Sequence, residues 1–153
     1  MPNTSHVPPV DFIQHLVPLL VGAVGGALFL LFAYYARPLH TRKILARGLI
    51  IAALVYIYFS VDAHTSTSWL LVELLGVGIY GTLGMLGLRR SAWWLVAGWA
   101  AHPVWDIAIH YVGPGSEFAP AWYTIPCLSW DLVVAGALAY RLARGWTPAL
   151  QPS

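Results

Sequence analysis

Five long stretches of the chain carry almost no charged residues, and polar segments separate them. The stretches cover residues 16–36, 44–64, 69–88, 92–112 and 124–140. A helix rises about 1.5 Å per residue, so about 20 apolar residues cross the roughly 30 Å hydrocarbon core of a bilayer. Proline, glycine and serine gather where helices are expected to stop, at "RPLHT", "VGPGSEFAP" and "GWTPALQPS". The pattern predicts an all-α fold, a polytopic bundle of five transmembrane helices.

The composition supports a membrane protein. Apolar residues make up 59% of the chain and charged residues only 9%, whereas soluble domains carry about 25% charged residues. We expect a single transmembrane domain over residues 1–153, located in the cell membrane, with the lipid bilayer as its surroundings. The first stretch is too long for the apolar part of a signal peptide and no basic segment precedes it, so we expect a retained helix.

All eight basic residues lie beside connections on one side of the predicted bundle. They surround the first connection, fill the third and follow the last stretch: Arg37, Arg42, Lys43, Arg47, Arg89, Arg90, Arg141 and Arg144. Loops rich in lysine and arginine stay in the cytoplasm, so we expect the N-terminus outside and the C-terminus inside the cell. The pI near 8.9 then reflects topology, and we expect no nucleic-acid partner.

Three acidic residues lie inside apolar stretches, at similar depths. Counted from the outer helix ends, Glu73, Asp106 and Asp131 lie about 6, 9 and 10 Å deep. A carboxylate that faced lipid at such depth would cost several kcal/mol. We therefore expect the three carboxyl groups to face the bundle interior in one shared layer.

Helical spacing extends this layer into stripes of polar side chains. His102, Asp106 and His110 are four residues apart in the fourth stretch, and Pro103 predicts a kink beside them. Further pairs, also on common helix faces, are Tyr58 with Asp62, Glu73 with Tyr80, and Cys127 with Asp131. Together they predict a polar pocket that opens toward the outer face, with residues 113–127 as its roof.

Aromatic residues and glycines suggest how the helices pack. Three tryptophans lie deep enough to form a pocket wall, although core packing is the simpler role: Trp99, Trp105 and Trp130. Small residues allow helices to approach closely, and we expect this of Gly22 and Gly26 and of the row Gly78, Gly81, Gly84 and Gly87, with dimerisation as the alternative. Cys127 is the only cysteine, so it forms no internal disulfide, and its simplest role is that of a small buried apolar residue.

The last two helices resemble a known family. The runs "HPVWDIAIHY", "FAP" and "CLSWD" are similar to those of small bacterial multi-pass membrane proteins that are known only as a domain of unknown function. The resemblance implies importance for His102, Trp105, Asp106, His110, Cys127 and Asp131. Ile109 and Trp130 depart from the family pattern, which weakens the inference of a metal site.

The first functional hypothesis is an enzyme that acts on a lipophilic, isoprenoid-like molecule by proton transfer, as an isomerase or cyclase. A carboxyl group in an apolar setting favours its protonated form and can act as an acid, while an ionised neighbour acts as the base. The candidate catalytic residues are Asp106 and Asp131 as the acid and base pair, with Glu73, His102 and His110. Aromatic side chains can stabilise a carbocation, and the candidate substrate-binding residues are Tyr58, Tyr80, Trp99, Trp105, Cys127 and Trp130.

Two alternatives come from other functional classes. A metal or haem site could use His102, Asp106 and His110 with Glu73 or Asp131. Ligands eight residues apart lie about 12 Å apart along a helix, so the helix would have to bend at Pro103. Two neighbouring ligands with a carboxylate from another helix would form such a site more easily. The other alternative is a binding, transport or accessory subunit in a larger membrane complex, as a homo- or hetero-oligomer, where the carboxyl groups are proton or substrate sites or hold helices together. The sequence has no phosphate-binding glycine loop, no G-x-S-x-G elbow and no H-E-x-x-H motif, and the cofactor, if any, is not identified by it.

Overall fold

Each of the five apolar stretches forms a helix in the computed structural model, which describes residues 10–37 and 40–146. The long helices are α1 (Val10–Leu31), α2 (Thr41–Asp62), α3 (Thr67–Arg89), α4 (Trp93–Trp105) and α5 (Ala121–Ala143). Two π-helical segments continue α1 and α4, namely η1 (Phe32–Ala36) and η3 (Asp106–Tyr111), and a short 3-10 turn, η4 (Pro114–Glu117), precedes α5. No strand occurs in the described residues, which confirms the all-α prediction.

Four helical segments are each long and apolar enough to cross a membrane: Gln14–Tyr35, Thr41–Asp62, Thr67–Arg89 and Ala121–Ala143. They characterise a membrane-embedded protein. The fourth apolar stretch is divided between α4, with 13 residues, and η3, with 6 residues, so neither part has the length of a span by itself. The ends of the predicted domain, residues 1–9 and 147–153, lie outside the described residues.

The observed helices extend beyond most of the predicted boundaries. α2 begins at Thr41 rather than at residue 44, and α5 covers Ala121–Ala143 rather than 124–140. Hydropathy locates the apolar middle of a helix, whereas the first and last turns lie at the membrane surface and tolerate polar residues. Pro126 lies inside α5, so this proline does not end a helix.

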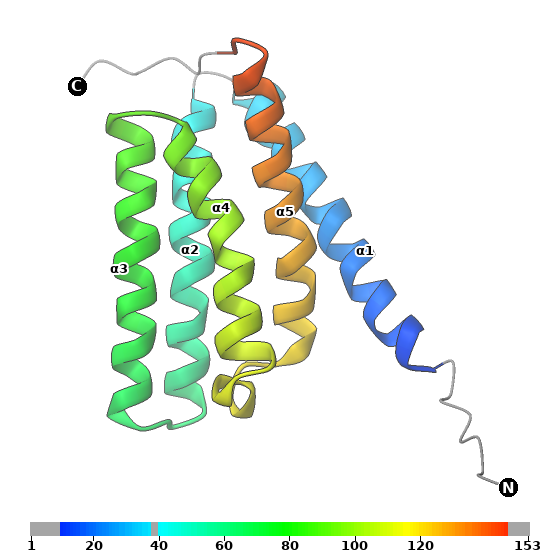
Figure 1. The fold of residues 1–153 in the computed structure, drawn as a ribbon, viewed down its shortest axis with the longest axis vertical. Helices are drawn as coiled ribbons and strands as arrows, with labels where there is room; N and C mark the ends of the chain where they lie inside the picture. Colours follow the sequence, from blue (N-terminus) through cyan, green and yellow to red (C-terminus); the bar gives the residue numbers. More distant parts are fainter. Residues whose placement is uncertain (1–9, 38–39, 147–153) are drawn as a thin grey trace, which may run out of the picture.

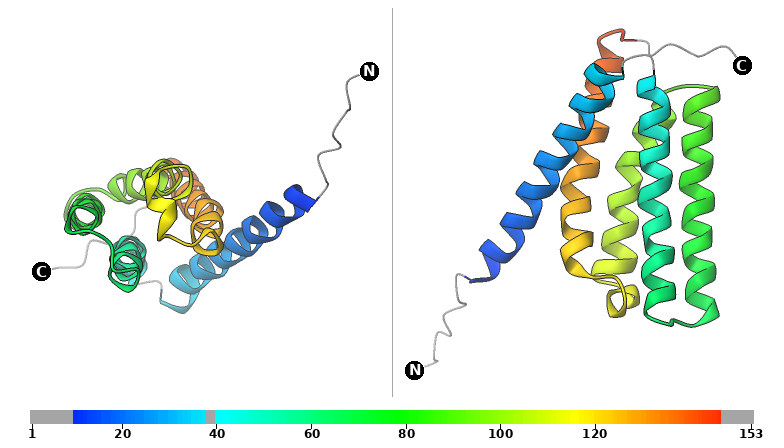
Figure 2. Two further views of the ribbon diagram at one scale, coloured as in Figure 1. Left: turned by 90° about the horizontal axis from the view of Figure 1, so that it is seen from below. Right: turned by 180° about the vertical axis from the view of Figure 1, so that it is seen from behind.

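Helices α2, α3, α4 and α5 stand side by side as an upright bundle, and α1 runs obliquely along α5 (Figure 1). The N-terminal half of α1 leads away from the bundle in both side views (Figures 1 and 2). The apolar core lies between the helices and includes Leu45, Leu49, Leu95, Trp99, Val134 and Leu138. Large apolar side chains also cover the outer surface, as expected for helices that face lipid.

Glycine allows α1 to lie directly against α5. A Cβ atom added at Gly22 would lie 2.0 Å from the carbonyl oxygen of Pro126, and one at Gly26 would lie 2.9 Å from the carbonyl oxygen of Trp130. The predicted glycine row on α3 is only partly a contact: a Cβ at Gly87 would meet Leu95, but Gly78 and Gly81 have nothing within 4 Å. The expectation was therefore wrong for Gly78 and Gly81, which lie on the outer face of α3.

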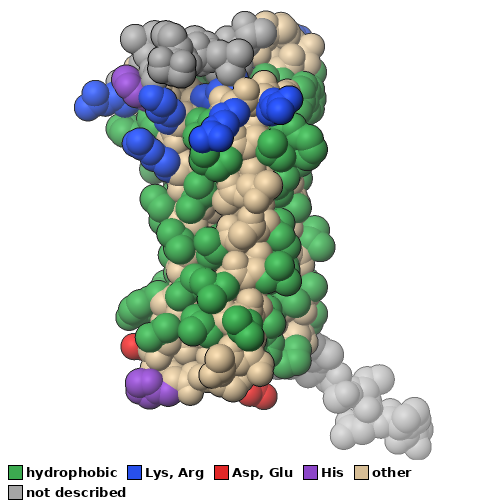
Figure 3. All heavy atoms as spheres, turned by 90° about the vertical axis from the view of Figure 1, so that its left-hand side faces the viewer, with side chains coloured by type: hydrophobic (Ala, Val, Ile, Leu, Met, Phe, Trp, Pro, Cys, Tyr) green, Lys and Arg blue, Asp and Glu red, His purple; other side chains and the backbone are tan. Residues whose placement is uncertain are grey.

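The basic residues gather at one end of the molecule. They follow η1, begin α2, end α3 and end α5, and Figure 3 shows lysine and arginine side chains together at the end opposite to the exposed acids of that view. Arg42 is buried there and donates a hydrogen bond from Nε to the carbonyl oxygen of Gly87. An apolar belt separates the two ends (Figure 3).

Candidate functional site

The fourth apolar stretch changes its helical form where its polar side chains lie. Pro103 has no N–H group, so the carbonyl of Trp99 lacks its usual partner within the helix. The segment Asp106–Tyr111 then continues as a π-helix, and the N–H of Val112 bonds to the carbonyl of Ile107, five residues earlier. π-helical turns inside helices are frequent at functional sites. Here the turn follows His102 and includes Asp106 and His110.

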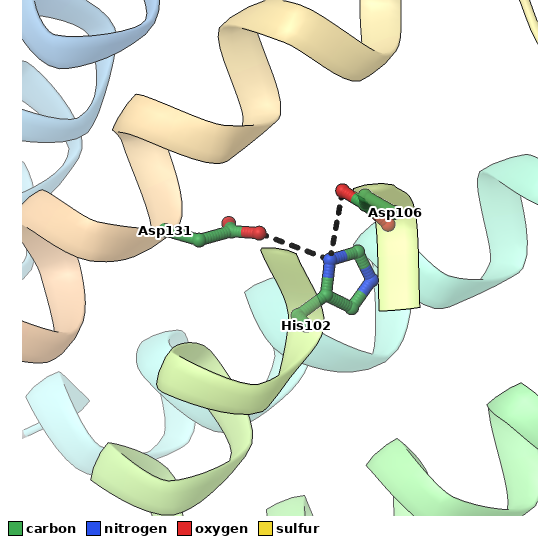
Figure 4. A group of neighbouring side chains, drawn as sticks. All are labelled: His102, Asp106 and Asp131. Atoms are coloured by element: carbon green, nitrogen blue, oxygen red, sulfur yellow. Dashed lines mark hydrogen bonds and ion pairs between the residues drawn. The ribbon is translucent and has the colours of Figure 1, made fainter. Parts of the chain in front are cut away.

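Two carboxylates approach one nitrogen atom of His102. The Nδ1–H group of His102 donates a hydrogen bond to Oδ2 of Asp131 at 2.9 Å, and the same nitrogen lies 3.3 Å from Oδ2 of Asp106. Figure 4 shows both carboxyl groups turned toward that nitrogen, Asp131 from α5 and Asp106 from η3. All three side chains are at most 2% exposed. We call His102, Asp106 and Asp131 the triad.

A single N–H group cannot satisfy two carboxylates. The hydrogen bond goes to Asp131, whereas neither oxygen of Asp106 accepts a hydrogen bond and Nε2 of His102 has no partner. A neutral imidazole beside two ionised carboxylates would leave two negative charges inside the membrane, where α4 meets η3 and in the middle of α5, away from the basic helix ends. Charge balance in the triad therefore requires further protons or a bound cation.

A second buried pair lies beside the triad. The Nε2–H group of His110 donates a hydrogen bond to Oε1 of Glu73 at 2.9 Å, and both side chains are at most 1% exposed. Tyr56 of α2 stacks on His110 with ring centroids 3.8 Å apart, and its centroid lies 6.3 Å from that of His102. Tyr56 therefore connects the second pair with the triad.

The turn between α4 and α5 covers the second pair. A Cβ atom added at Gly115 would lie 2.9 Å from Cδ2 of His110, and the ring of Phe118 meets the ring of His110 edge-on at 5.9 Å. The predicted roof over the site is thus present at His110. The predicted opening toward the outer face is wrong for these side chains, because the turn packs on His110 and the side chains of His102, Asp106, Asp131, His110 and Glu73 are all at most 2% exposed.

The structure separates the predicted carboxyl groups into two sets. All three face the interior, and Asp106 and Asp131 share His102, but Glu73 binds His110 instead. His110 therefore does not orient the predicted acid and base pair. In the predicted stripe, His102 lies before the π-helical turn and Asp106 lies at its start. The wider turn rotates His110 toward Glu73 of α3 rather than toward Asp131 of α5.

The aromatic candidates take different positions. Tyr80 lies at the triad, with its ring 4.7 Å from that of His102 and its hydroxyl donating to the carbonyl of Ala101 at 3.2 Å. Trp105 packs on Tyr80 and Gly76. Trp99 is buried in the core beside Phe29, and Trp130 packs on Gly25 and Gly26 of α1. Trp130 therefore lies between α1 and α5 rather than on a wall of the triad.

Tyr58 was assigned to the wrong face of its helix. Its side chain is 62% exposed, and Asp62, four residues later, is exposed as well. The buried stripe of α2 instead contains Tyr56 and Ser60, which are also four residues apart. That spacing was visible in the sequence, but both stripes lie in an apolar helix, so only packing distinguishes them. Cys127 is partly buried and remains a free thiol.

Comparison with known proteins places the chain in a family. A family model described as a family of unknown function, DUF6010, matches residues 13–145. The chain belongs to this family. The match covers all five apolar stretches and confirms the expected membership of an uncharacterised family. No curated protein and no solved structure matches the chain.

The triad of this DUF6010 protein also has the donor set of a metal site. One ligand atom from each of His102, Asp106 and Asp131 lies within 4.8 Å of the others. One imidazole and two carboxylates suit zinc or iron, and three protein ligands leave a position for water or substrate. His110 and Glu73 are not in this group, which consists of two neighbouring residues of the fourth stretch and a carboxylate from another helix.

Proposed function

We propose that this protein is an acid/base catalyst inside the membrane that acts on a lipophilic, isoprenoid-like molecule, as an isomerase or cyclase. The observation that carries the proposal is the approach of two buried carboxyl groups to one nitrogen of His102. The three side chains of such a cluster share a small number of protons, and a proton can move from one group to another at little cost. The cluster can therefore give a proton to a substrate or take one from it. A site closed to water favours proton transfer to a lipophilic substrate rather than to solvent.

The two carboxyl groups have different surroundings, which suggests different roles. Asp131 holds the ring of His102 through its hydrogen bond, whereas Asp106 accepts no hydrogen bond and is free to give or take a proton. The ring of Tyr80 lies 4.7 Å from that of His102, and the ring of Trp105 packs on Tyr80; these rings can stabilise positive charge in a substrate. Asp106 and Asp131 thus act as the acid and base pair, and His102 couples them.

In this proposal the chain crosses the cell membrane five times, and α4 and η3 together form the fourth crossing. The segment from Trp93 to Tyr111 is helical throughout and continues through the apolar belt. All eight basic residues lie at one end of the bundle, which favours a cytoplasmic C-terminus and an outer N-terminus. The triad then lies in the outer half of the bilayer.

A second candidate function is a divalent metal centre at the triad. It is favoured by the convergence of three ligand atoms within 4.8 Å and by the unsatisfied oxygens of Asp106. Purified wild-type protein would then contain zinc or iron in stoichiometric amount, and Asp131→Asn would lose it. Glu73→Gln is the matched control, because it alters a buried carboxyl group outside the triad.

The principal test compares lipid extracts from host cells that produce wild-type protein, Asp106→Asn, Asp131→Asn or the surface control Leu132→Ala. We expect wild type and Leu132→Ala to change the same isoprenoid or sterol-like species, detected by mass spectrometry, and both Asn variants to leave it unchanged. An Asn side chain keeps the shape of Asp but cannot transfer a proton. A wild-type extract identical to that of cells without the protein would contradict the proposal and favour a binding or accessory role.

A further inference from the structure

A narrow groove lies between α1, η3 and α5, close to the triad. Its volume is about 200 Å³, and it is lined by residues 15 and 19 of α1, residues 107, 111 and 112 of the fourth stretch, and residues 124, 125 and 128 of α5. Pockets for whole small molecules have volumes of about 300–1,000 Å³. The groove therefore has room for one segment of a ligand rather than for a whole molecule of that size.

The surface of the groove is apolar, but the types of residue that line it differ along its length on all three walls. His15, Tyr111 and Thr124 lie near its mouth, at the end of the bundle opposite to the basic residues. A hydrogen bond joins Nε2 of His15 to the hydroxyl of Tyr111 at 2.7 Å. Four residues farther into the membrane on each wall, the side chains are apolar: Leu19, Ile107 and Leu128.

This gradient matches the orientation of a membrane lipid, whose polar end lies at the surface and whose chain points inward. The groove lies where α1 runs obliquely along the other helices, and the N-terminal end of α1 leads away from them there (Figures 1 and 2), so the groove has access to the bilayer. Its wall is adjacent to the triad in the chain, because Ile107 follows Asp106 directly and Leu128 precedes Asp131 by three residues.

We propose that the groove binds one hydrocarbon chain of a membrane lipid, with the lipid's polar end beside His15 and Tyr111. Its chain contacts Leu19, Ile107 and Leu128. The groove is then the lateral entrance by which a lipophilic substrate reaches the triad from the bilayer. The role of the groove as a substrate entrance rests on the proposed function. Binding of the hydrocarbon chain in the groove can be measured without any catalytic turnover.

The test uses the full-length protein in nanodiscs of phosphatidylcholine that contain a phosphatidylcholine with a photoreactive diazirine in its acyl chain. After illumination, mass spectrometry locates the labelled residues. We expect labelling of segments 107–112 and 124–128 above the background on the outer face of α3, where Leu71 and Leu75 are exposed to any surrounding lipid. Leu128→Trp should remove most of the groove labelling, because an indole fills the space for the chain.

The matched control is Leu132→Trp, which lies one turn farther along α5, is 52% exposed and does not line the groove. It should keep the groove labelling of wild type. Groove labelling no higher than on α3, or labelling that survives in Leu128→Trp, would overturn the inference. Labelling lost in Leu128→Trp and unchanged in Asp106→Asn supports it, whatever the outcome of the lipid-extract experiment, so the two proposals fail separately.

Discussion

Among the single residues, His102 decides the chemistry of the site. Its Nδ1 atom faces two carboxyl groups, at 2.9 Å from Asp131 and 3.3 Å from Asp106, and only Asp131 accepts its hydrogen bond. Asp131 therefore satisfies a buried donor, whereas Asp106 is a buried carboxyl group with no donor of its own. The two aspartates should respond differently to substitution.

We expect Asp131→Ala to lower the free energy of unfolding by about 1–3 kcal/mol, because it removes the acceptor at 2.9 Å from the buried N–H of His102 and leaves only the carboxyl group of Asp106, at 3.3 Å. Asp106→Ala should cost less, since it removes a buried acid that accepts no hydrogen bond. Thermal or denaturant unfolding of both variants in the same detergent measures the difference. Equal losses of stability, or a larger loss in Asp106→Ala, would show that Asp106 is held by an interaction of similar strength.

At the scale of helices, the close contact between α1 and α5 depends on small residues. The glycines on the outer face of α3 make no such contact. Gly22 leaves no room for a side chain against the backbone of Pro126, and Ser129 of α5 donates a hydrogen bond to the carbonyl of Leu19 at 2.7 Å beside it. Gly78 lies in a helix of similar length but meets nothing within 4 Å. The two glycines form a matched pair for testing the packing of α1.

We expect Gly22→Ala to destabilise the protein by about 1–3 kcal/mol through overpacking. Gly78→Ala should be neutral or should stabilise by up to about 1 kcal/mol, because alanine favours a helix more than glycine does. Unfolding midpoints of the two variants in detergent test this. If Gly22→Ala were as stable as Gly78→Ala, α1 would not pack on α5 at this contact.

At the scale of the whole molecule, charge is divided between the two ends. The basic residues gather at one end, while the triad and the pair of His110 and Glu73 are buried toward the other half. This asymmetry fits a membrane protein whose basic loops remain in the cytoplasm. It also keeps lysine and arginine away from the buried carboxyl groups, so these groups must be neutralised locally.

We expect a reporter fused to the C-terminus to be active only in the cytoplasm, and one inserted after Pro114 to be active only outside the cell. The pair of fusions brackets the last crossing, because Pro114 lies in the turn before α5 and the C-terminus follows α5. Enzyme reporters that work on one side of the membrane measure the location. Two reporters active on the same side would contradict the five-span arrangement.

The sequence by itself determined the helices and the burial of the acids. Apolar length fixes a helix in a membrane, because every backbone group must be satisfied within the segment. The cost of a charge in lipid likewise predicted that Glu73, Asp106 and Asp131 face inward, and the structure confirms this. Membership of the family was also visible in the last two helices, and the family match confirms it.

Only the tertiary structure decided which side chains meet. Both the lipid-facing and the core-facing sides of these helices are apolar, so hydropathy says little about the rotation of a helix about its axis. For this reason Tyr58 was predicted to face the pocket although its side chain is exposed, and Gly78 and Gly81 were assigned a contact that they do not make. The partner of His110 depends in addition on the π-helical turn after Pro103, which changes the spacing that an ideal helix would give. The pairing of Asp131 with His102 and of Glu73 with His110 is set by contacts between helices, and such contacts leave no periodic signal in a single sequence.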